Sequence, residues 1–300
     1  MDTSQLLRAS AARVINDHEN GSSKIAQRFL QDIIDITSAS SFRFNEETRR
    51  EFSDLLLRLP HIRPSMAVFA TIAAELAPSL ALKKSAAVKL RNTAQTLLSI
   101  FTQAPEKIAA YLAPLLDEQS AALTYSFSSV VWQTLRRIHT KIDALYILES
   151  APGREGIALA AAIRENAELD HWKVTLAPDM LLDMAMSKAQ CCVIGADALL
   201  GDGNFVNKCG ARLLLRSAAE QRKPVYIVCE SLKIAPNGWL WRPETFAQSE
   251  LIPYAPRAVS VLNEPFELAP LLQCVAVTEI GVLSAGQIAD RAKKLAYGLL

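Results

Sequence analysis

Apolar positions follow a helical period through the first third of the chain. They recur every three to four residues, the spacing that places side chains on one face of an α-helix. No run in this part alternates apolar and polar residues in the manner of a strand. The sequence therefore predicts an all-helical N-terminal domain over residues 1–117. The expected helices have apolar stripes at 6–14, 25–34 and 52–57, after Pro64, and over 82–102 and 105–116.

A different pattern begins after Ser120. Short, continuous apolar runs alternate with helical segments, which is typical of a parallel sheet covered by helices on both faces. Residues 118–300 are therefore predicted to form a doubly wound α/β domain. The expected strands are 122–125, 144–148, 173–177, 190–195 and 225–229, with two more at 258–262 and 275–278. The expected helices are 129–138, 154–163, 180–186, 206–220 and 285–299.

Composition and charge narrow the classes of function. The 300 residues carry 32 Lys and Arg against 31 Asp and Glu, a net charge of +1, so no broad basic field favours direct nucleic-acid binding. No apolar run reaches the roughly 18 residues that span a bilayer. The acid at position 2 and the polar N-terminal segment argue against a signal peptide. We expect a cytoplasmic protein that has no membrane partner.

The five cysteines are expected to be buried and reduced. They form no Cys-x-x-Cys pair and lie apart from the four histidines along the chain, so neither a disulfide framework nor a metal site is favoured. The glycine spacing near residue 200 fits neither the dinucleotide fingerprint nor a Walker loop. We expect no metal and no cofactor.

Four turns at the carboxyl ends of expected strands are candidates for ligand binding, because ligands of open parallel sheets bind there. In the first turn, 124–129, hydroxyls and backbone N–H groups suit an anion, although a helix cap at Ser128 or Ser129 explains the same residues. In the second, 149–156, Gly156 would let the backbone approach a ligand. Arg154 either contacts phosphate there or is solvated.

The third and fourth turns carry charged side chains. Asp197 follows an apolar strand and precedes a glycine loop, with Asn207 and Lys208 at the expected start of the next helix. Asp197 suits an acid/base group or a partner for a sugar hydroxyl, and Lys208 supplies positive charge. The alternative is a carboxylate that ties the loop backbone together. Lys233 follows the fifth strand and either reaches the same crevice or lies on the surface.

These turns, taken in order, resemble one family. It unites the alpha, beta and delta regulatory subunits of translation initiation factor 2B with two isomerases, which act on methylthioribose-1-phosphate and ribose-1,5-bisphosphate. The resemblance covers most of the chain and implies a helical N-terminal domain, a Rossmann-like doubly wound domain, and a dimer formed mainly through the latter. The matching segments are 195–197 with Gly203 and 207–210, 149–156, 230–233, 277–284, Arg63-Pro64-Ser65, and 21–26.

The first two turns depart from the isomerase pattern. Where those enzymes carry a cysteine after Thr-His, this chain has Ser126 after Tyr125, and Ala151 stands where an arginine is common in the family. A serine hydroxyl is a far weaker acid than a thiol, and a methyl group cannot hold phosphate. The first turn therefore looks more like the regulatory subunits, which lack the catalytic cysteine and act through binding and assembly.

Three functions remain open. The first is a non-catalytic, regulatory-subunit-like protein that binds a sugar phosphate or nucleoside monophosphate and self-associates as a homodimer or higher oligomer. The second is an aldose–ketose isomerase of a phosphorylated pentose, with Asp197 as general acid/base and Ser126 as hydrogen-bond donor. The third is a diverged member whose crevice no longer binds. A translation initiation factor partner is expected only for a eukaryotic or archaeal source. The expected ligand-binding residues are Gly21, Ser22, Arg63, Arg154, Gly156, Asn207, Lys208 and Lys233.

Overall fold

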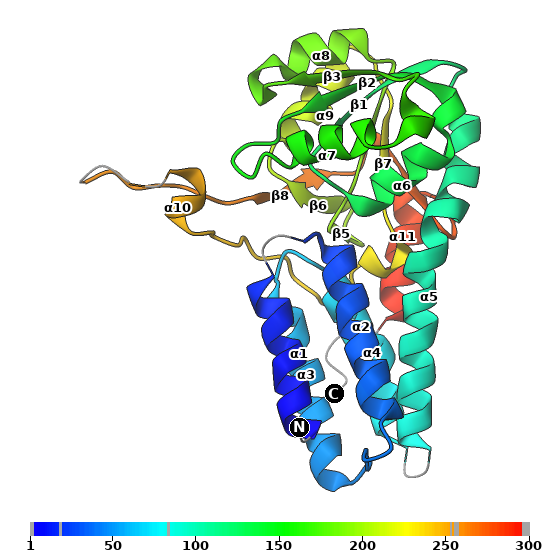
Figure 1. Ribbon diagram of the computed structural model, residues 1–300, viewed down its shortest axis with the longest axis vertical. Helices are drawn as coiled ribbons and strands as arrows, with labels where there is room; N and C mark the ends of the chain where they lie inside the picture. The colour runs from blue at the N-terminus through cyan, green and yellow to red at the C-terminus, as the bar shows by residue number, and fades with distance from the viewer. Residues whose placement is uncertain (1–2, 18–19, 83–84, 253, 255–257, 296–300) are drawn as a thin grey trace.

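The computed structural model describes residues 3–17, 20–82, 85–252, 254 and 258–295 (Figure 1). Helices α1 to α5 form a bundle at one end of the molecule, and a seven-stranded sheet with its helices forms the other. The helices are α1 Thr3–Asn16, α2 Ser22–Ser38, α3 Glu46–Ile62, α4 Val68–Leu80, α5 Ala86–Leu112, α6 Ser129–Arg137, α7 Glu155–Arg164, α8 Leu182–Lys188, α9 Ala211–Glu220, α10 Gln248–Leu251 and α11 Ala285–Lys294. The strands are β1 Ser120–Tyr125, β2 Ile142–Leu148, β3 Lys173–Ala177, β4 Cys191–Ile194, β5 Ala198–Leu199, β6 Asn204–Lys208, β7 Val225–Val228, β8 Phe266–Pro270, β9 Cys274–Thr278 and β10 Gly281–Leu283.

The bundle forms as its apolar stripes predict, except within α5. The predicted break between residues 102 and 105 is wrong, because α5 is one uninterrupted helix that contains Pro105. Proline in a helix interior costs about 3 kcal/mol. Pro105 is buried, and α5 packs against α2, α4, α6 and β9 along its length. That packing offsets the cost and makes α5 the helix that joins the bundle to the sheet (Figure 1).

The large sheet confirms the doubly wound α/β prediction. Its strand order is β10-β9-β7-β4-β1-β2-β3, and every neighbouring pair is parallel except β9 and β10. The chain winds outward from β1 to β3 on one side and from β4 to β9 on the other. The strand order therefore reverses between β1 and β4, which is where ligands of such sheets bind.

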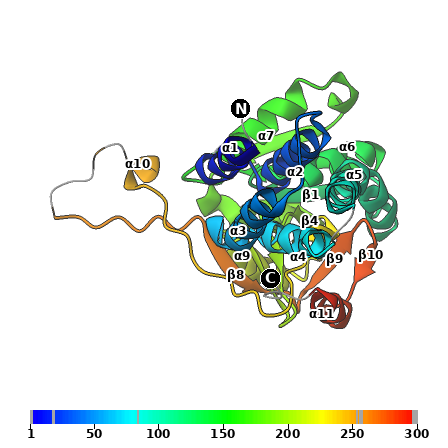
Figure 2. The same ribbon diagram turned by 90° about the horizontal axis from the view of Figure 1, so that it is seen from below.

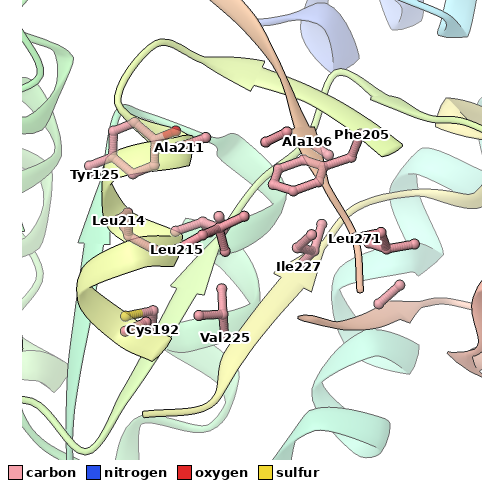
Figure 3. Close-up of a cluster of buried hydrophobic side chains, with 14 of the residues drawn as sticks. Tyr125, Cys192, Ala196, Phe205, Ala211, Leu214, Leu215, Val225, Ile227 and Leu271 are labelled. Atoms are coloured by element: carbon pink, nitrogen blue, oxygen red, sulfur yellow. The ribbon is translucent and has the colours of Figure 1, made fainter. Parts of the chain in front are cut away.

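Apolar layers cover both faces of this sheet. Side chains of α5, α6 and α7 pack on one face, and those of α8, α9 and α11 pack on the other. Figure 3 shows part of the second layer, where Leu214 and Leu215 of α9 lie over Cys192, Val225 and Ile227 of the sheet. Burial of each large aliphatic side chain contributes about 1.5–3 kcal/mol. Burial on both faces explains why the central strands are continuous apolar runs in the sequence.

A second, antiparallel sheet of order β5-β6-β8 lies outside the sequence prediction. The expected helix 206–220 is wrong at its start, because its first residues belong to β6 and α9 begins only at Ala211. Gly210, at φ 103°, turns the chain between the two elements. β6 pairs with β5 and β8 on its two edges, and this pairing overrides the local helical pattern. Asn207 and Lys208 therefore lie on a strand and not at a helix start.

The segment between β7 and β8 leaves the body of the molecule and returns to it (Figures 1 and 2). Its described residues 246–252, Tyr254 and 258–263 are named the arm. The predicted strand 258–262 is wrong, since the described residues of that stretch form no strand. At the base, the Phe246 N–H donates to the Asn263 carbonyl (2.9 Å), so the two ends of the arm are held together where they leave the body.

The closing helix α11 begins where the sequence predicts, at Ala285, and ends at Lys294. Residues 296–299 of the predicted helix lie outside the described residues. Among the helices that the structure describes, none is both long and apolar enough to cross a membrane.

Candidate functional site

Asp197 is held at the carboxyl edge of the large sheet by three distant segments. Its carboxylate accepts a hydrogen bond from the Ser22 hydroxyl at the start of α2 (2.6 Å). Its N–H donates to the Val206 carbonyl of β6 (2.8 Å), and its carbonyl accepts from the Ala67 N–H just before α4 (3.1 Å). The predicted site residues Ser22 and Asp197 are therefore in contact, and residues of both the bundle and the sheet region contribute to this site.

Lys233 lies beside Asp197 and is only 3% exposed, so the surface alternative is wrong for this side chain. Its ammonium nitrogen lies 3.5 Å from a carboxylate oxygen of Glu230. Burial alone would lower the pKa of Lys233, but the negative charges of Glu230 and Asp197 outweigh burial and raise the pKa above its ordinary value. Lys233 is therefore a fixed cation inside the fold.

Two glutamates beside this lysine were missed from the sequence, although both follow strands at the carboxyl edge. They are Glu230 after β7 and Glu279 after β9. One Glu279 oxygen accepts from the Ser231 N–H (2.8 Å), whereas the other is buried without a hydrogen-bond partner among the described residues. Such an oxygen costs free energy until a donor reaches it. We name one group of residues the Asp197 cluster: Ser22, Asp197, Glu230, Lys233 and Glu279.

The first turn of α2 lies beside the β1–α6 turn. Gly21 is the N-cap residue of α2 and provides no side-chain cap, and a Cβ placed on it would lie 4.0 Å from the Phe127 carbonyl oxygen. Backbone N–H groups at a helix N-terminus and the helix dipole attract anions. The predicted residue Gly21 thus lies next to Ser22, where α2 meets the edge of the sheet.

The β1–α6 turn is shaped by hydrogen bonds to neighbouring backbone. Ser126 adopts φ 61°, in the left-handed region that residues other than glycine rarely occupy. Its N–H donates to the Ser150 hydroxyl (2.6 Å), which links the turns after β1 and β2. Ser128 caps α6 by accepting from the Val131 N–H (3.4 Å), so the capping alternative holds for that residue.

In the β2–α7 turn, a close approach of two backbone segments requires glycine at position 156. A Cβ on Gly156 would lie 1.9 Å from the Leu148 carbonyl oxygen, so only glycine lets α7 start this close to its own strand. Arg154, at the N-cap of α7, is exposed, as the solvated alternative requires.

Asp179, which orders the same turn, was missed from the sequence. Its carboxylate accepts from two consecutive N–H groups beginning at Ser150 (2.8 and 2.7 Å) and orders the turn.

Tyr125, Asn207 and Lys208 form a buried hydrogen-bonded group between β1 and β6. The Tyr125 hydroxyl donates to the Lys208 carbonyl (2.7 Å) and accepts from the Asn207 amide (3.0 Å). Burial, and after it the charge of Glu267, raise the pKa of Tyr125 well above its ordinary value. The Lys208 ammonium pairs with Glu155 at 2.6 Å. Asn207 and Lys208 are thus engaged inside the protein, by Tyr125 and Glu155.

Arg63 lies where the bundle meets the base of the arm. It is buried, donates to the Asp17 carbonyl (2.7 Å) and forms an ion pair with Glu244 at 3.3 Å. Glu244 precedes the arm and also accepts from the Ser65 N–H (2.8 Å). The Arg-Pro-Ser segment therefore anchors the arm, and none of its contacts among the described residues reaches the Asp197 cluster.

Burial raises the pKa of the two thiols nearest these groups. Cys229 lies beside Lys233 and Glu230, and its pKa is raised strongly by burial despite the lysine. The pKa of Cys209 is also raised, by burial first, although Lys208 opposes the shift. Raised thiol pKa values leave little thiolate at neutral pH. Within the described residues, no three His, Cys, Asp or Glu side chains are grouped as metal ligands would be.

A cavity of about 950 Å³ lies away from this edge, against α3 and α4. Apolar side chains such as Leu56, Leu57 and Ala73 line it, together with Leu295 beyond α11. None of the predicted site residues is among its lining residues. The ligand groups singled out from the sequence are therefore gathered at the carboxyl edge of the sheet and not around this cavity.

The chain matches known proteins over most of its length. The model described as the Initiation factor 2 subunit family matches residues 18–285. A Pyrococcus furiosus protein, named as an eIF-2B subunit 2-like translation initiation factor, is 29% identical over 202 residues that cover 65% of this chain and 68% of that protein. A ribose 1,5-bisphosphate isomerase of Archaeoglobus fulgidus is 22% identical over 283 residues, which cover 91% of this chain and 88% of that protein.

Solved structures share the fold. The translation initiation factor eIF-2B of Pyrococcus horikoshii superposes with a TM-score of 0.77 at 21% identity, over 92% of this chain and 96% of that chain. A chain of the tetrameric eIF2B-beta2-delta2 complex from C. thermophilum gives a TM-score of 0.70 at 15% identity, over 97% and 95%. At these identities the likeness establishes the arrangement of helices and strands.

Proposed function

This chain belongs to the Initiation factor 2 subunit family, and we propose that within the family it acts as a non-catalytic binding protein. It holds a sugar phosphate or a nucleoside monophosphate at the Asp197 cluster, and it self-associates. The observation that carries the proposal is the contact between Ser22 and Asp197 beside the buried cation Lys233. It brings a helix N-terminus, a carboxylate and a positive charge to one point.

The phosphate would lie at the start of α2. The Asp197 cluster has three carboxylates and one ammonium, so its centre repels an anion. The N–H groups around Gly21 and Ser22, aided by the helix dipole, offer the most favourable place for a phosphate. Lys233 is the nearest buried cation and would partly offset the carboxylates.

The sugar hydroxyls would lie over the carboxylates. A carboxylate only accepts hydrogen bonds, and a hydroxyl donates one. Asp197 has a second oxygen beyond the one that accepts from Ser22, and Glu279 has a buried oxygen without a described partner. A polyhydroxyl ligand supplies the donors that these two oxygens require, and this match supports a sugar over an apolar ligand.

The absence of turnover rests on proton-transfer chemistry. An aldose–ketose isomerase moves a proton between two carbons and needs a group that exchanges protons near neutral pH. Ser126 is a very weak acid. Burial raises the pKa of Tyr125, Cys229 and Cys209, away from neutrality. Because none of these four groups exchanges protons readily near neutral pH, their chemistry favours binding over catalysis.

One finding favours a second candidate, an isomerase of a phosphorylated pentose. Of the two relatives matched by sequence above, the one that covers the larger share of this chain, 91% against 65%, is named an isomerase. In that role Asp197 would be the general acid/base, Ser126 a hydrogen-bond donor, and Lys208 or Lys233 a stabiliser of developing charge. Turnover of a phosphopentose by the wild-type protein, lost in Asp197→Asn, would establish this candidate in place of the binding protein.

Self-association and a protein partner complete the proposal. A structural neighbour is a chain of a tetrameric complex, and the P. furiosus relative is named as a translation initiation factor. A translation-factor partner follows only if the source is archaeal or eukaryotic.

Thermal shift and calorimetry test the ligand. The panel contains ribose-1,5-bisphosphate, methylthioribose-1-phosphate, ribose-5-phosphate and AMP. A ligand at 100 times its dissociation constant stabilises the fold by about 2.7 kcal/mol. Asp197→Asn keeps an oxygen for Ser22 and removes the charge, so we expect binding at least about tenfold weaker. Asp290→Asn, on the exposed face of α11, is the matched control and keeps wild-type affinity. Silence of the wild-type protein across the panel would reject the ligand.

A further inference from the structure

The cavity of about 950 Å³ against α3 and α4 is named the α3–α4 groove. Leu57 of α3 lines it and is 44% exposed. On the side of α4, its lining residues are small and recur at helical spacing: Ala70, Ala73, Ala74, Ala77 and Ala81. Small side chains along a helix leave a space that well-packed proteins rarely leave empty. The groove is therefore shaped for an apolar occupant.

The described part of the chain ends at one end of this groove. Leu295 is among the lining residues. Its N–H and the Asn237 N–H both donate to the Ala292 carbonyl (3.2 and 2.9 Å). Three residues before Asn237, the Ile234 carbonyl accepts from the Thr71 hydroxyl in the first turn of α4 (2.9 Å). The same short segment thus contacts the end of α11 and the start of α4, which places Leu295 where α4 begins.

The sequence that follows Leu295 matches the groove in length and character. Residues 296–300 are Ala-Tyr-Gly-Leu-Leu, with three large apolar side chains and no charged one. Five extended residues span about 16 Å, and α4 rises by about 16 Å between Ala70 and Ala81. Alternate side chains of an extended segment share a face, so Tyr297 and Leu299 would enter the groove together.

The charged residues of the lining favour an uncharged occupant. Arg49 and Arg50 lie 3.6 and 3.9 Å from Glu46, and Arg49 also donates to the Leu82 carbonyl (3.1 Å). An anionic ligand would have to compete with Glu46 for these guanidinium groups. A segment without charged side chains leaves the pairs intact, which favours the chain's own residues over an amphiphile with an anionic head group.

We propose that residues 296–300 pack in extended form into the α3–α4 groove of their own protomer. α11 belongs to the sheet region, where Ile288 and Ala292 are buried, whereas α3 and α4 belong to the bundle. The segment therefore acts as a strap between the two parts of the molecule, whose residues Ser22 and Asp197 form the contact at the candidate site. The strap does not depend on the ligand of the proposed function.

Disulfide cross-linking in the full chain tests the position of the segment. Leu299→Cys is combined with Ala77→Cys in the groove, and the joined peptides are identified by mass spectrometry, which separates them from those of the native cysteines. The control pair combines Leu299→Cys with Met180→Cys, at a residue that is 93% exposed beside α8, at the end of the molecule away from the bundle (Figure 1). We expect the groove pair to join at least about tenfold faster than the control pair, within one chain.

Urea unfolding tests whether the contact is part of the folded protomer. Tyr297→Asp and Leu299→Asp each place a charge against apolar side chains. Each should lower the urea midpoint and raise the unfolded fraction at a given urea concentration roughly tenfold. Met180→Asp places the same charge at an exposed position and should retain the wild-type midpoint. Circular dichroism should show wild-type helix content for all three variants without urea.

Three outcomes would overturn the proposal. Equal rates for the two cysteine pairs would show that Leu299 does not lie in the groove. A cross-linked product of twice the chain mass would assign the groove to residues 296–300 of a second copy. Wild-type midpoints for both Tyr297→Asp and Leu299→Asp would show that the segment does not pack there. Ligand binding at the Asp197 cluster is measured on the wild-type protein, so its success or failure is independent of these results.

Discussion

The Asp197 cluster and the arm reverse the usual distribution of side chains in opposite ways. In the cluster, charged groups such as Lys233 and Glu230 are buried, and other groups of the same chain surround them. In the arm, apolar side chains such as Leu262 and Tyr254 are exposed to solvent. Removing one member of a buried charge pair leaves the other charge uncompensated, so the stability of the protomer depends on the cluster staying intact. The exposed side chains of the arm contribute little to that stability.

Substitutions in the two regions should affect the stability of the protomer differently. Changes near the cluster should appear as lost stability of the isolated protomer, because backbone and ion pairs there are interlocked. Changes on the arm should leave that stability within about 0.5 kcal/mol, as for ordinary surface positions. Lys233→Met tests the cluster directly, and Gly156→Ala and Cys191→Ala extend the test to other buried positions.

The largest effect is expected from Gly156→Ala. The added Cβ would lie 1.9 Å from the Leu148 carbonyl oxygen, so α7 must move away from β2 and disturb the turn that Asp179 orders. We expect a loss of about 4–5 kcal/mol in the free energy of unfolding, measured with urea. Gly286→Ala is the control, since a Cβ there would lie 3.9 Å from the Ser284 hydroxyl oxygen, an ordinary van der Waals contact, and it should be neutral or slightly stabilising. Equal stability of the two variants would contradict the close approach.

A smaller loss is expected when the buried cation is removed. Lys233→Met keeps most of the volume and leaves Glu230 and Asp197 without their positive partner. Breaking a buried pair in this way costs about 3 kcal/mol, to be read from urea unfolding at pH 7. Glu250→Gln, which removes the only charge from the described arm, should change stability by less than about 0.5 kcal/mol. If the two variants are alike, the cluster is not the stabilising element that its burial indicates.

The smallest effect, taken per pH unit, concerns alkaline pH. Burial, and then the charge of Asp117, raise the pKa of Cys191 from about 9 to about 12. The unfolded thiol loses its proton first, so the stability that this thiol contributes is complete below pH 9 and is lost as pH rises from 9 to 12. Cys191→Ala should reduce the slope of unfolding free energy against pH in that window by about 1.4 kcal/mol per unit.

The control for this experiment lies on the arm. Ser260→Ala changes an exposed residue and should retain the wild-type slope. The readout is the slope and not the absolute stability, because the substitution at Cys191 also removes packing in β4. A Cys191→Ala protein with the wild-type slope would show that burial of this thiol does not govern the alkaline loss.

Much of the fold was accessible from the sequence, and the exceptions are instructive. The prediction of strand 173–177 coincides with β3. A short apolar run between two helical segments is enough to identify such a strand. Pro105 was taken as the start of a separate helix, yet it lies inside α5. Residues 206–208, which belong to β6, were assigned to a helix. In both cases packing with distant segments outweighs the local preference, which no window along the chain can reveal.

The candidate site was accessible only in outline. The rule that ligand groups follow parallel strands selected Asp197 and Lys233, and the same rule would also have selected Glu230 and Glu279. It could not distinguish a ligand contact from an internal one. Lys208 pairs with Glu155, and Arg63 pairs with Glu244 across 181 positions. Such partners are separated along the chain by whole elements, so their pairing is decided when those elements pack.

The pattern of residues along the chain predicts the helical bundle, the alternation of strands and helices, and the edge of the sheet where polar groups collect. Each of these follows from a period of a few residues or from the type of residue that ends a strand. The folded structure is needed to see that Ser22 contacts Asp197, that Lys233 is buried, and that Leu262 remains exposed on a projecting arm. Periodicity depends only on residues that are close together along the chain, whereas burial and pairing depend on which surfaces meet after the chain has folded.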